Sequence, residues 1–176
     1  MSSIFVPRTT APALDDLNYI SHYAPYNGYN YCIIIDSATG YVMPNCTGYA
    51  WGRWRELLGA YHNLSRGNAS VWYGNTSDGY QRGQTAKIAA VACWSGGSDG
   101  AGHVGIVEDI DSTGFWMSNS AYQSYMFRYQ HITGNFFQSG YTFQGFIYFP
   151  EEFLEVWMLN MKKKNESGDN LNAIQL

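Results

Sequence analysis

A chain of 176 residues suits a single domain, long enough to bury roughly 70% of the surface that its unfolded state exposes. Only 14% of the residues are charged and 17% are aromatic, which excludes a disordered chain and a coiled coil. The formal net charge of −4 argues against nucleic acid as a partner.

The first forty residues are rich in Pro, Tyr and Asn, with one β-branched run at Ile33–Ile35. This composition predicts an arm, residues 1–40, that wraps around the domain rather than forming its core. The N-terminus has neither the basic region nor the apolar run of an export signal. No apolar stretch in the chain is long enough to span a membrane. We therefore expect no signal peptide and no membrane partner.

A helix is predicted to begin at Cys46. Pro44 ends the segment before it, and Asn45 is a suitable N-cap residue. The apolar positions that follow recur at helical spacing, at Ala50, Trp54, Leu57 and Tyr61. A second, shorter helix could open at residues 68–72.

From residue 88 the pattern changes to short runs rich in β-branched or aromatic residues, separated by Gly, Ser, Asn or Asp. Five strands are predicted, at Ile88–Trp94, His103–Ile110, Gly114–Asn119, Met126–Ile132 and Phe143–Phe149. A helical half followed by a meandering antiparallel sheet is typical of an α+β fold.

After Pro150 the pattern becomes helical again. Residues 151–164 place acidic side chains first and three lysines last, as a helix dipole prefers. This helix could dock on the domain or attach the chain to a partner, and the sequence leaves both open. Residues 165–176 are expected to fray.

Cys46 is the candidate nucleophile. Backbone N–H groups and the positive end of the dipole favour a thiolate in the first turn of a helix. The same N–H groups could hold an oxyanion, with the Asn45 side chain as a second donor. The alternative is an ordinary small residue at a helix start. Cys32 and Cys93 lie in apolar runs and read as core residues, and three isolated cysteines predict neither a disulfide framework nor a zinc site.

His103 is the candidate base because it opens a predicted strand after a loop of Gly, Ser and Asp. Along that strand His103 shares a face with Gly105 and Val107, and Gly105 leaves room beside the imidazole for a substrate or a helix end. A lone histidine in a strand is more often structural than catalytic. The hypothesis therefore depends on the pair of Cys46 and His103.

A Cys–His pair also needs a group that orients the imidazole. Asn119 on the following strand is our candidate. A tight turn between the strands would place Asn119 opposite Ile106, nearly a full step away from His103, and a longer turn or a bulge would close that gap. Glu108 is disfavoured because its side chain should leave the opposite face of the strand.

Three segments together resemble the CHAP domain, the cysteine, histidine-dependent amidohydrolase/peptidase family of bacterial and phage cell-wall lysins. They are Asn-Cys-Thr-Gly-Tyr-Ala-Trp-Gly-Arg at 45–53, Gly-His-Val-Gly-Ile-Val-Glu at 102–108 and Ser-Asn-Ser-Ala-Tyr at 118–122. The resemblance covers residues 44–150, and it implies a catalytic domain at 41–150 with a papain-like α+β fold. It implies Cys46 as nucleophile and His103 as base, with Asn119 where many members have a glutamate.

The resemblance also implies the substrate and the setting. The family cuts peptidoglycan at the stem amide or within the peptide or cross-bridge. Some relatives bind calcium through closely spaced aspartates before the cysteine, but only Asp36 lies there, so we expect no metal and no cofactor. No wall-binding domain is visible, and a phage tail to which the helix at 151–164 attaches could supply targeting. The expected location is a virion tail, or the host cytoplasm before lysis.

Tyr49 and Trp94 are candidates for lining the substrate groove, because sugar rings and peptide stems pack on aromatic faces. The alternative is that these large side chains belong to the core. Two other functions remain open: a catalytically silent structural or wall-binding tail component with the same fold, and a papain-like protease that acts on proteins.

Overall fold

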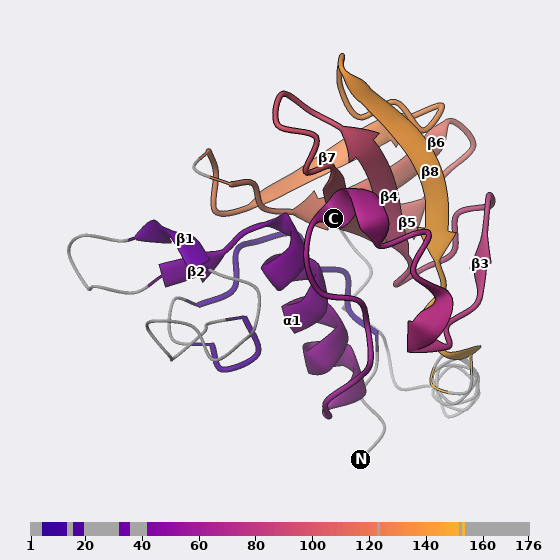
Figure 1. The fold of residues 1–176 in the computed structure, drawn as a ribbon. Coiled ribbons are helices and arrows are strands. Elements are labelled where there is room, and N and C mark those ends of the chain that lie inside the picture. The colour runs from indigo at the N-terminus through magenta and orange to yellow at the C-terminus, as the bar shows by residue number, and fades with distance from the viewer. Residues whose placement is uncertain are drawn as a thin grey trace.

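The computed structural model describes residues 5–13, 16–19, 32–35, 42–122, 124–151 and 153. In these residues two short antiparallel strands, β1 (Cys32–Ile35) and β2 (Val42–Pro44), lead into α1 (Cys46–Leu58). Helix α1 lies against a larger curved sheet, and the β1–β2 pair stands beside the end of the helix at which α1 begins (Figure 1).

The larger sheet is antiparallel throughout, with the strand order β3-β8-β4-β5-β6-β7. Its strands are β3 (Arg82–Gly83), β4 (Val91–Gly96), β5 (His103–Ile110), β6 (Gly114–Asn119), β7 (Arg128–Thr133) and β8 (Tyr141–Ile147). The predicted α+β class is confirmed, and the bounds of β5 and β6 agree with the prediction. The strand β3 has no counterpart in the prediction.

Helix α1 begins where the sequence predicts and ends one turn early. The Asn45 side-chain oxygen accepts a hydrogen bond from the Gly48 N–H at 3.0 Å, which caps the first turn. At the other end Gly59 adopts φ +65°, and its N–H bonds to the Arg55 carbonyl. A left-handed glycine of this kind closes a helix, so Tyr61 lies beyond it.

The second predicted helix is not an α-helix. The segment holds only a 3-10 turn, η1 (Ala69–Val71). The Ser70 N–H donates to the Ala101 carbonyl in the loop before β5 instead of to its own segment. The buried Trp72 indole donates to the Gly67 carbonyl, which folds the segment back on itself. Contacts with the loop before β5 therefore override the local helical pattern.

The core has two parts, one on each face of the sheet. The first lies between the sheet and α1 and contains Ala50, Trp54, Val91, Cys93 and Ile106 among others. The second lies on the other face and contains Trp94, Val107, Phe115, Met117 and Phe146 among others. The strands β4 and β5 alternate between these two clusters because successive side chains point to opposite faces. The central strands are therefore buried on both sides.

A buried ion pair joins α1 to the sheet. Arg53 donates from Nε and Nη2 to the two carboxylate oxygens of Glu108, both at 3.0 Å, and both side chains are almost fully buried. The Ser118 hydroxyl and the Arg8 backbone N–H also donate to Glu108. Glu56 accepts from Arg53 at 2.7 Å and from Arg8. The network satisfies a carboxylate that would otherwise be costly to bury.

The pairing of β5 with β6 contains a β-bulge at Glu108. Val107 pairs with Met117 and Asp109 pairs with Trp116, so Glu108 is the extra residue. Beyond the bulge the register is shifted by one residue, and Ile106 pairs with Ser118 rather than with Asn119. The bulge therefore brings Asn119 one step closer to His103, one of the two ways of closing that gap expected from the sequence.

The described parts of the N-terminal arm lie against α1. Phe5 and Tyr19 are buried in the first core, and the Tyr19 hydroxyl donates to Glu56. At the C-terminus the structure describes Glu151 and Phe153 as helical, whereas the rest of the predicted helix and tail lies outside the described residues. No helix in the described part of the chain is long and apolar enough to cross a membrane.

We expect Glu108→Ala to lower the free energy of unfolding by about 3–5 kcal/mol, because it leaves the buried Arg53 guanidinium without its main counter-charge. Urea denaturation followed by circular dichroism measures the change. The matched control is Glu151→Ala, which removes the exposed ion pair with Lys87 and should leave the midpoint unchanged. Equal shifts for the two variants would contradict the role of the buried pair.

Candidate functional site

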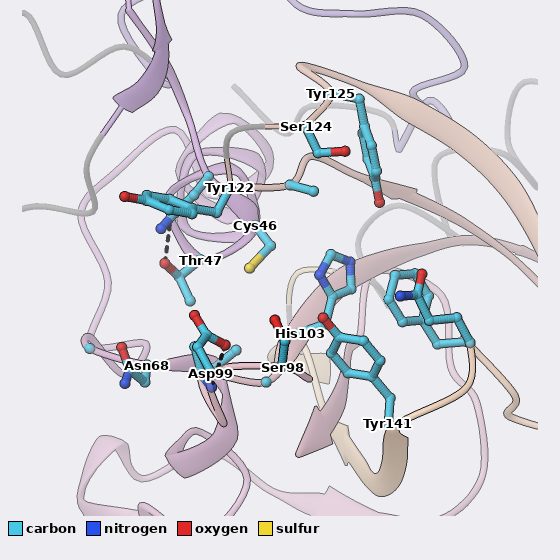
Figure 2. A pocket seen from close by; sticks show the side chains of 18 of the residues that line it. Cys46, Thr47, Asn68, Ser98, Asp99, His103, Tyr122, Ser124, Tyr125 and Tyr141 are labelled. Carbon is cyan, nitrogen blue, oxygen red and sulfur yellow. Dashed lines mark hydrogen bonds between the residues drawn. The ribbon is translucent and has the colours of Figure 1, made fainter. Parts of the chain in front are cut away.

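Cys46 is the first residue of α1 and lies at the wall of a cavity. It is only 8% exposed, and its side chain and that of His103 line the same cavity (Figure 2). Its position follows from the Asn45 cap, since the helix can begin only after the capping residue. The structure therefore brings the predicted nucleophile and the predicted base to one place.

His103 is the first residue of β5 and is held on two sides. The Phe137 ring stacks on the imidazole with 4.2 Å between ring centroids and 6° between planes. The Nε2 atom of His103 lies 3.1 Å from Asn119 Oδ1, a hydrogen-bond distance. The imidazole is 3% exposed. Stacking and hydrogen bonding together fix both the plane and the rotation of the ring.

The bond to Asn119 determines which nitrogen of His103 carries the proton. An amide oxygen can only accept, so Nε2 must be the protonated nitrogen in this pair. In a neutral imidazole the other nitrogen, Nδ1, then carries a lone pair and no proton. His103 is thus in the tautomer that can take a proton from a thiol at Nδ1.

Asn119 is the last residue of β6 and is fully buried. Next to it the Ser120 hydroxyl donates to the Pro44 carbonyl at 2.8 Å, which ties the end of β6 to the residues that precede α1. The Asn119 and Cys46 sides of the site are therefore joined by a buried hydrogen bond that is independent of the helix–sheet contacts.

The cavity has a volume of about 650 Å³ and is open to solvent. Its wall combines the start of α1, the segment before η1, the loop before β5, the loop after β6 and the segment before β8. Asn68, Asp99, Tyr122, Ser124 and Tyr141 surround Cys46 and His103 in the view of the site (Figure 2). Polar groups and aromatic rings around one thiol and one imidazole make this cavity the candidate binding site.

Burial controls the ionisation of the pair. Burial raises the pKa of the Cys46 thiol to about 11, while hydrogen bonds from the backbone of Val104, Thr47 and Cys46 itself lower it by a smaller amount. Burial also lowers the pKa of the His103 imidazole to about 4, against the opposing effect of its bond to Asn119. Both groups are neutral at pH 7. The expected preference of the helix start for a thiolate is therefore outweighed by desolvation.

Asn45 lines the cavity next to Cys46. Its Oδ1 is occupied by the helix cap and by the Thr47 hydroxyl, which donates to it at 2.8 Å. The amide nitrogen is then the group of Asn45 that can donate to a ligand. This arrangement is compatible with the predicted oxyanion role and does not test it.

The two aromatic residues predicted to line the groove lie elsewhere. Tyr49 is fully buried, with its ring packed against Tyr19 and Phe127. Trp94 is 1% exposed in the second core, and its indole donates to the Asn135 carbonyl. Neither lines the cavity. Both rings lie in the core, because burying a large aromatic ring is more favourable than leaving it exposed to solvent.

The space expected beside Gly105 is already filled. A Cβ atom at this position would meet Met117 Sδ at 2.3 Å and Asn119 Cβ at 3.1 Å. The absence of a side chain therefore admits Met117 and Asn119, not a substrate or a helix end. Glu108 does leave the opposite face, toward Arg53.

Two aromatic residues of the site were not predicted from the sequence. Phe137 stacks on His103, and the Tyr125 hydroxyl donates to Asn119 Oδ1 at 2.5 Å. Both lie outside the strands, in turn-rich segments whose conformation has no periodic pattern. The only local signal is the presence of aromatic residues among Gly, Ser and Asn. Within the described residues, no group of three or more His, Cys, Asp or Glu side chains could hold a metal ion.

Comparisons with known proteins place the chain in context. Residues 36–123, half of the chain, match the family described as the CHAP domain. No curated protein matches the chain. A solved structure of an N-acetylmuramoyl-L-alanine amidase from Staphylococcus aureus is similar over 69% of this chain, with 20% identity and a TM-score of 0.43. The matched region is 36% of that chain, so this protein spans about a third of its length.

Alkylation of Cys46 by iodoacetamide should accelerate with pH without levelling off between about pH 6 and 10, because only the thiolate reacts and burial raises the thiol pKa. Mass spectrometry of the peptide that contains Cys46 measures the rate. Free cysteine, with a pKa of about 8.5, is the control whose rate levels off within this range. A rate for Cys46 that is already constant near neutral pH would instead indicate a preformed thiolate–imidazolium pair.

Proposed function

This chain belongs to the CHAP domain family, and from that premise we propose that it is a peptidoglycan hydrolase that cuts an amide bond with Cys46 as nucleophile. The observation that carries the proposal is the position of Cys46 and His103 on the wall of one cavity (Figure 2). The bond from His103 to Asn119 supports it, because it leaves Nδ1 as the proton acceptor. We also propose that the fold is of the papain-like kind, with the nucleophile at the start of a helix that packs on the sheet.

In the first half of the reaction His103 Nδ1 takes the proton of the Cys46 thiol while the sulfur attacks the carbonyl carbon of the substrate amide. The carbonyl oxygen becomes an oxyanion, which backbone N–H groups at the start of α1 can hold, with the amide nitrogen of Asn45 as a second donor. The tetrahedral intermediate then collapses. Its C–N bond breaks, and the leaving amine receives the proton from His103 Nδ1.

In the second half of the reaction water replaces the amine. His103 removes a proton from the water while the water oxygen attacks the thioester carbon. The C–S bond breaks, the thiol regains the proton, and the acid is released. The neutral ground state of Cys46 and His103 fits this scheme, since both protonation states needed at the start are populated at pH 7.

Asn119 acts in this scheme through His103. The oxygen of its amide accepts from Nε2–H and supports the positive charge that the imidazole carries after it has taken the thiol proton. A neutral amide stabilises that charge less than a carboxylate would. A neutral resting pair is consistent with this difference.

We propose that the enzyme works as a tail-associated lysin of a phage or as an endolysin, with peptidoglycan as its partner. The predicted attachment helix that could bind other tail proteins lies outside the described residues. Mass spectrometry of purified virions tests this setting. Detection of the chain in virions supports the tail role, and its presence in lysates alone supports the endolysin.

Cys46→Ala should reduce the lysis of purified cell walls by about a thousandfold or more, because no other group at the cavity wall can form the thioester. Loss of turbidity over a broad panel of walls measures the rate. Cys93→Ala is the matched control: it removes a thiol that is buried in the core, and it should keep the activity.

Two outcomes would contradict the proposal. Equal clearing by wild type and Cys46→Ala would remove the nucleophile, and the absence of clearing by wild type across the panel would favour the catalytically silent tail component. Mass spectrometry of the soluble products identifies the bond. A freed N-terminal alanine on the stem indicates an N-acetylmuramoyl-L-alanine amidase, and a new terminus within the stem or cross-bridge indicates an endopeptidase.

A further inference from the structure

Asn119 Oδ1 receives two hydrogen bonds. One comes from His103 Nε2 at 3.1 Å and the other from the Tyr125 hydroxyl at 2.5 Å. Of the two polar atoms of the Asn119 amide, only the oxygen can accept, and its two lone pairs satisfy both donors at once. The second donor belongs to a loop residue that lines the cavity, and Figure 2 shows its ring on the His103 side of that cavity.

We propose that Tyr125 is a positioning residue, whose hydroxyl holds the Asn119 amide with its oxygen toward His103 and thereby sets the imidazole tautomer needed to accept the Cys46 proton. The inference rests on the proposed function for its catalytic consequence. Its structural part, the orientation of an amide and the location of a proton, stands on the geometry of three side chains.

The orientation of Asn119 needs such a support. Among the residues that the structure describes, its amide nitrogen donates to the Arg128 carbonyl alone, at 3.4 Å, which is long for an N–H···O bond. If the amide turned over, its nitrogen would face His103 and would donate to Nε2. The imidazole proton would then move to Nδ1, and the nitrogen that accepts the thiol proton in the proposed reaction could no longer do so.

Tyr125 is itself held in place. The Arg128 guanidinium lies over the Tyr125 ring, 3.9 Å from its centroid. The backbone N–H of Ala121 donates to the Tyr125 carbonyl at 2.9 Å, which closes the loop after β6. A ring fixed by the loop and by the neighbouring cation directs its hydroxyl to one point. The short hydrogen bond from the Tyr125 hydroxyl to Asn119 is therefore held in place by the residues around it.

The first experiment compares Tyr125→Phe with wild type in initial rates of wall lysis over a range of wall concentrations. We expect apparent kcat to fall about tenfold, in line with the loss of one hydrogen bond, with KM unchanged. Tyr129→Phe removes the same hydroxyl from a residue of β7 that does not line the cavity, and it should keep both parameters. A rise in KM at constant kcat would assign Tyr125 to substrate binding and overturn the proposal.

The second experiment asks whether the effect passes through Asn119. In Asn119→Asp a carboxylate presents an acceptor oxygen to His103 in either orientation, so the hydroxyl of Tyr125 is no longer needed to orient it. We expect Tyr125→Phe to change kcat less than twofold in that background. A full tenfold loss there as well would overturn the coupling.

The third experiment needs no activity. Nitrogen NMR of the imidazole, with the His103 signals assigned from the His103→Gln variant, should show Nε2 protonated and Nδ1 unprotonated in wild type, and a mixture of tautomers in Tyr125→Phe. Wild type and Tyr125→Phe with the same tautomer would overturn the proposal even if the enzyme is active. A wild type that lyses no walls contradicts the proposed function alone, since the tautomers remain measurable.

Discussion

The buried ion pair between Arg53 and Glu108 is the contact on which the arrangement of the molecule depends. It is the only place among the described residues where a fully buried carboxylate of the sheet meets a buried cation of α1. Removing both charges from water is costly. The attraction between them offsets this cost only when α1 packs on β5 in the position and rotation that bring the two groups into hydrogen-bond contact. Because Cys46 begins the same helix, that fit also determines where the sulfur lies relative to His103.

Cys46 and His103, the proposed reacting groups, show a second balance between burial and local charge. The start of a helix favours an anion, yet the sulfur is so well covered that the neutral thiol prevails, and the imidazole is neutral for the same reason. For the proposed reaction, this favours proton transfer concerted with attack over attack by a resting thiolate. Substrate binding, which displaces water from the cavity, would sharpen the dependence on the orientation of Asn119 and His103.

The sequence predicts more of the fold than of the site. The strands β5 and β6 are delimited by turn residues and could be placed to the residue, and Asn45 with Cys46 could be recognised as a helix start. Spatial proximity of Cys46 to His103 rested on family motifs, since nothing in local periodicity brings a helix end to a strand end. From the sequence, a bulge between β5 and β6 was one of two possibilities, and its position at Glu108 could not be predicted. The burial of Trp94 depends on packing across both faces of the sheet, which the local sequence does not indicate.

The single extra residue in β5 links two parts of the molecule. Glu108 stands outside the ladder, so the same insertion directs its carboxylate toward α1 and moves Asn119 into range of His103. A deletion in this hairpin would misplace the anchor of the helix and the partner of the imidazole in one event. A deletion there could not act on the proposed site alone, because it would also disturb the contact between α1 and the sheet.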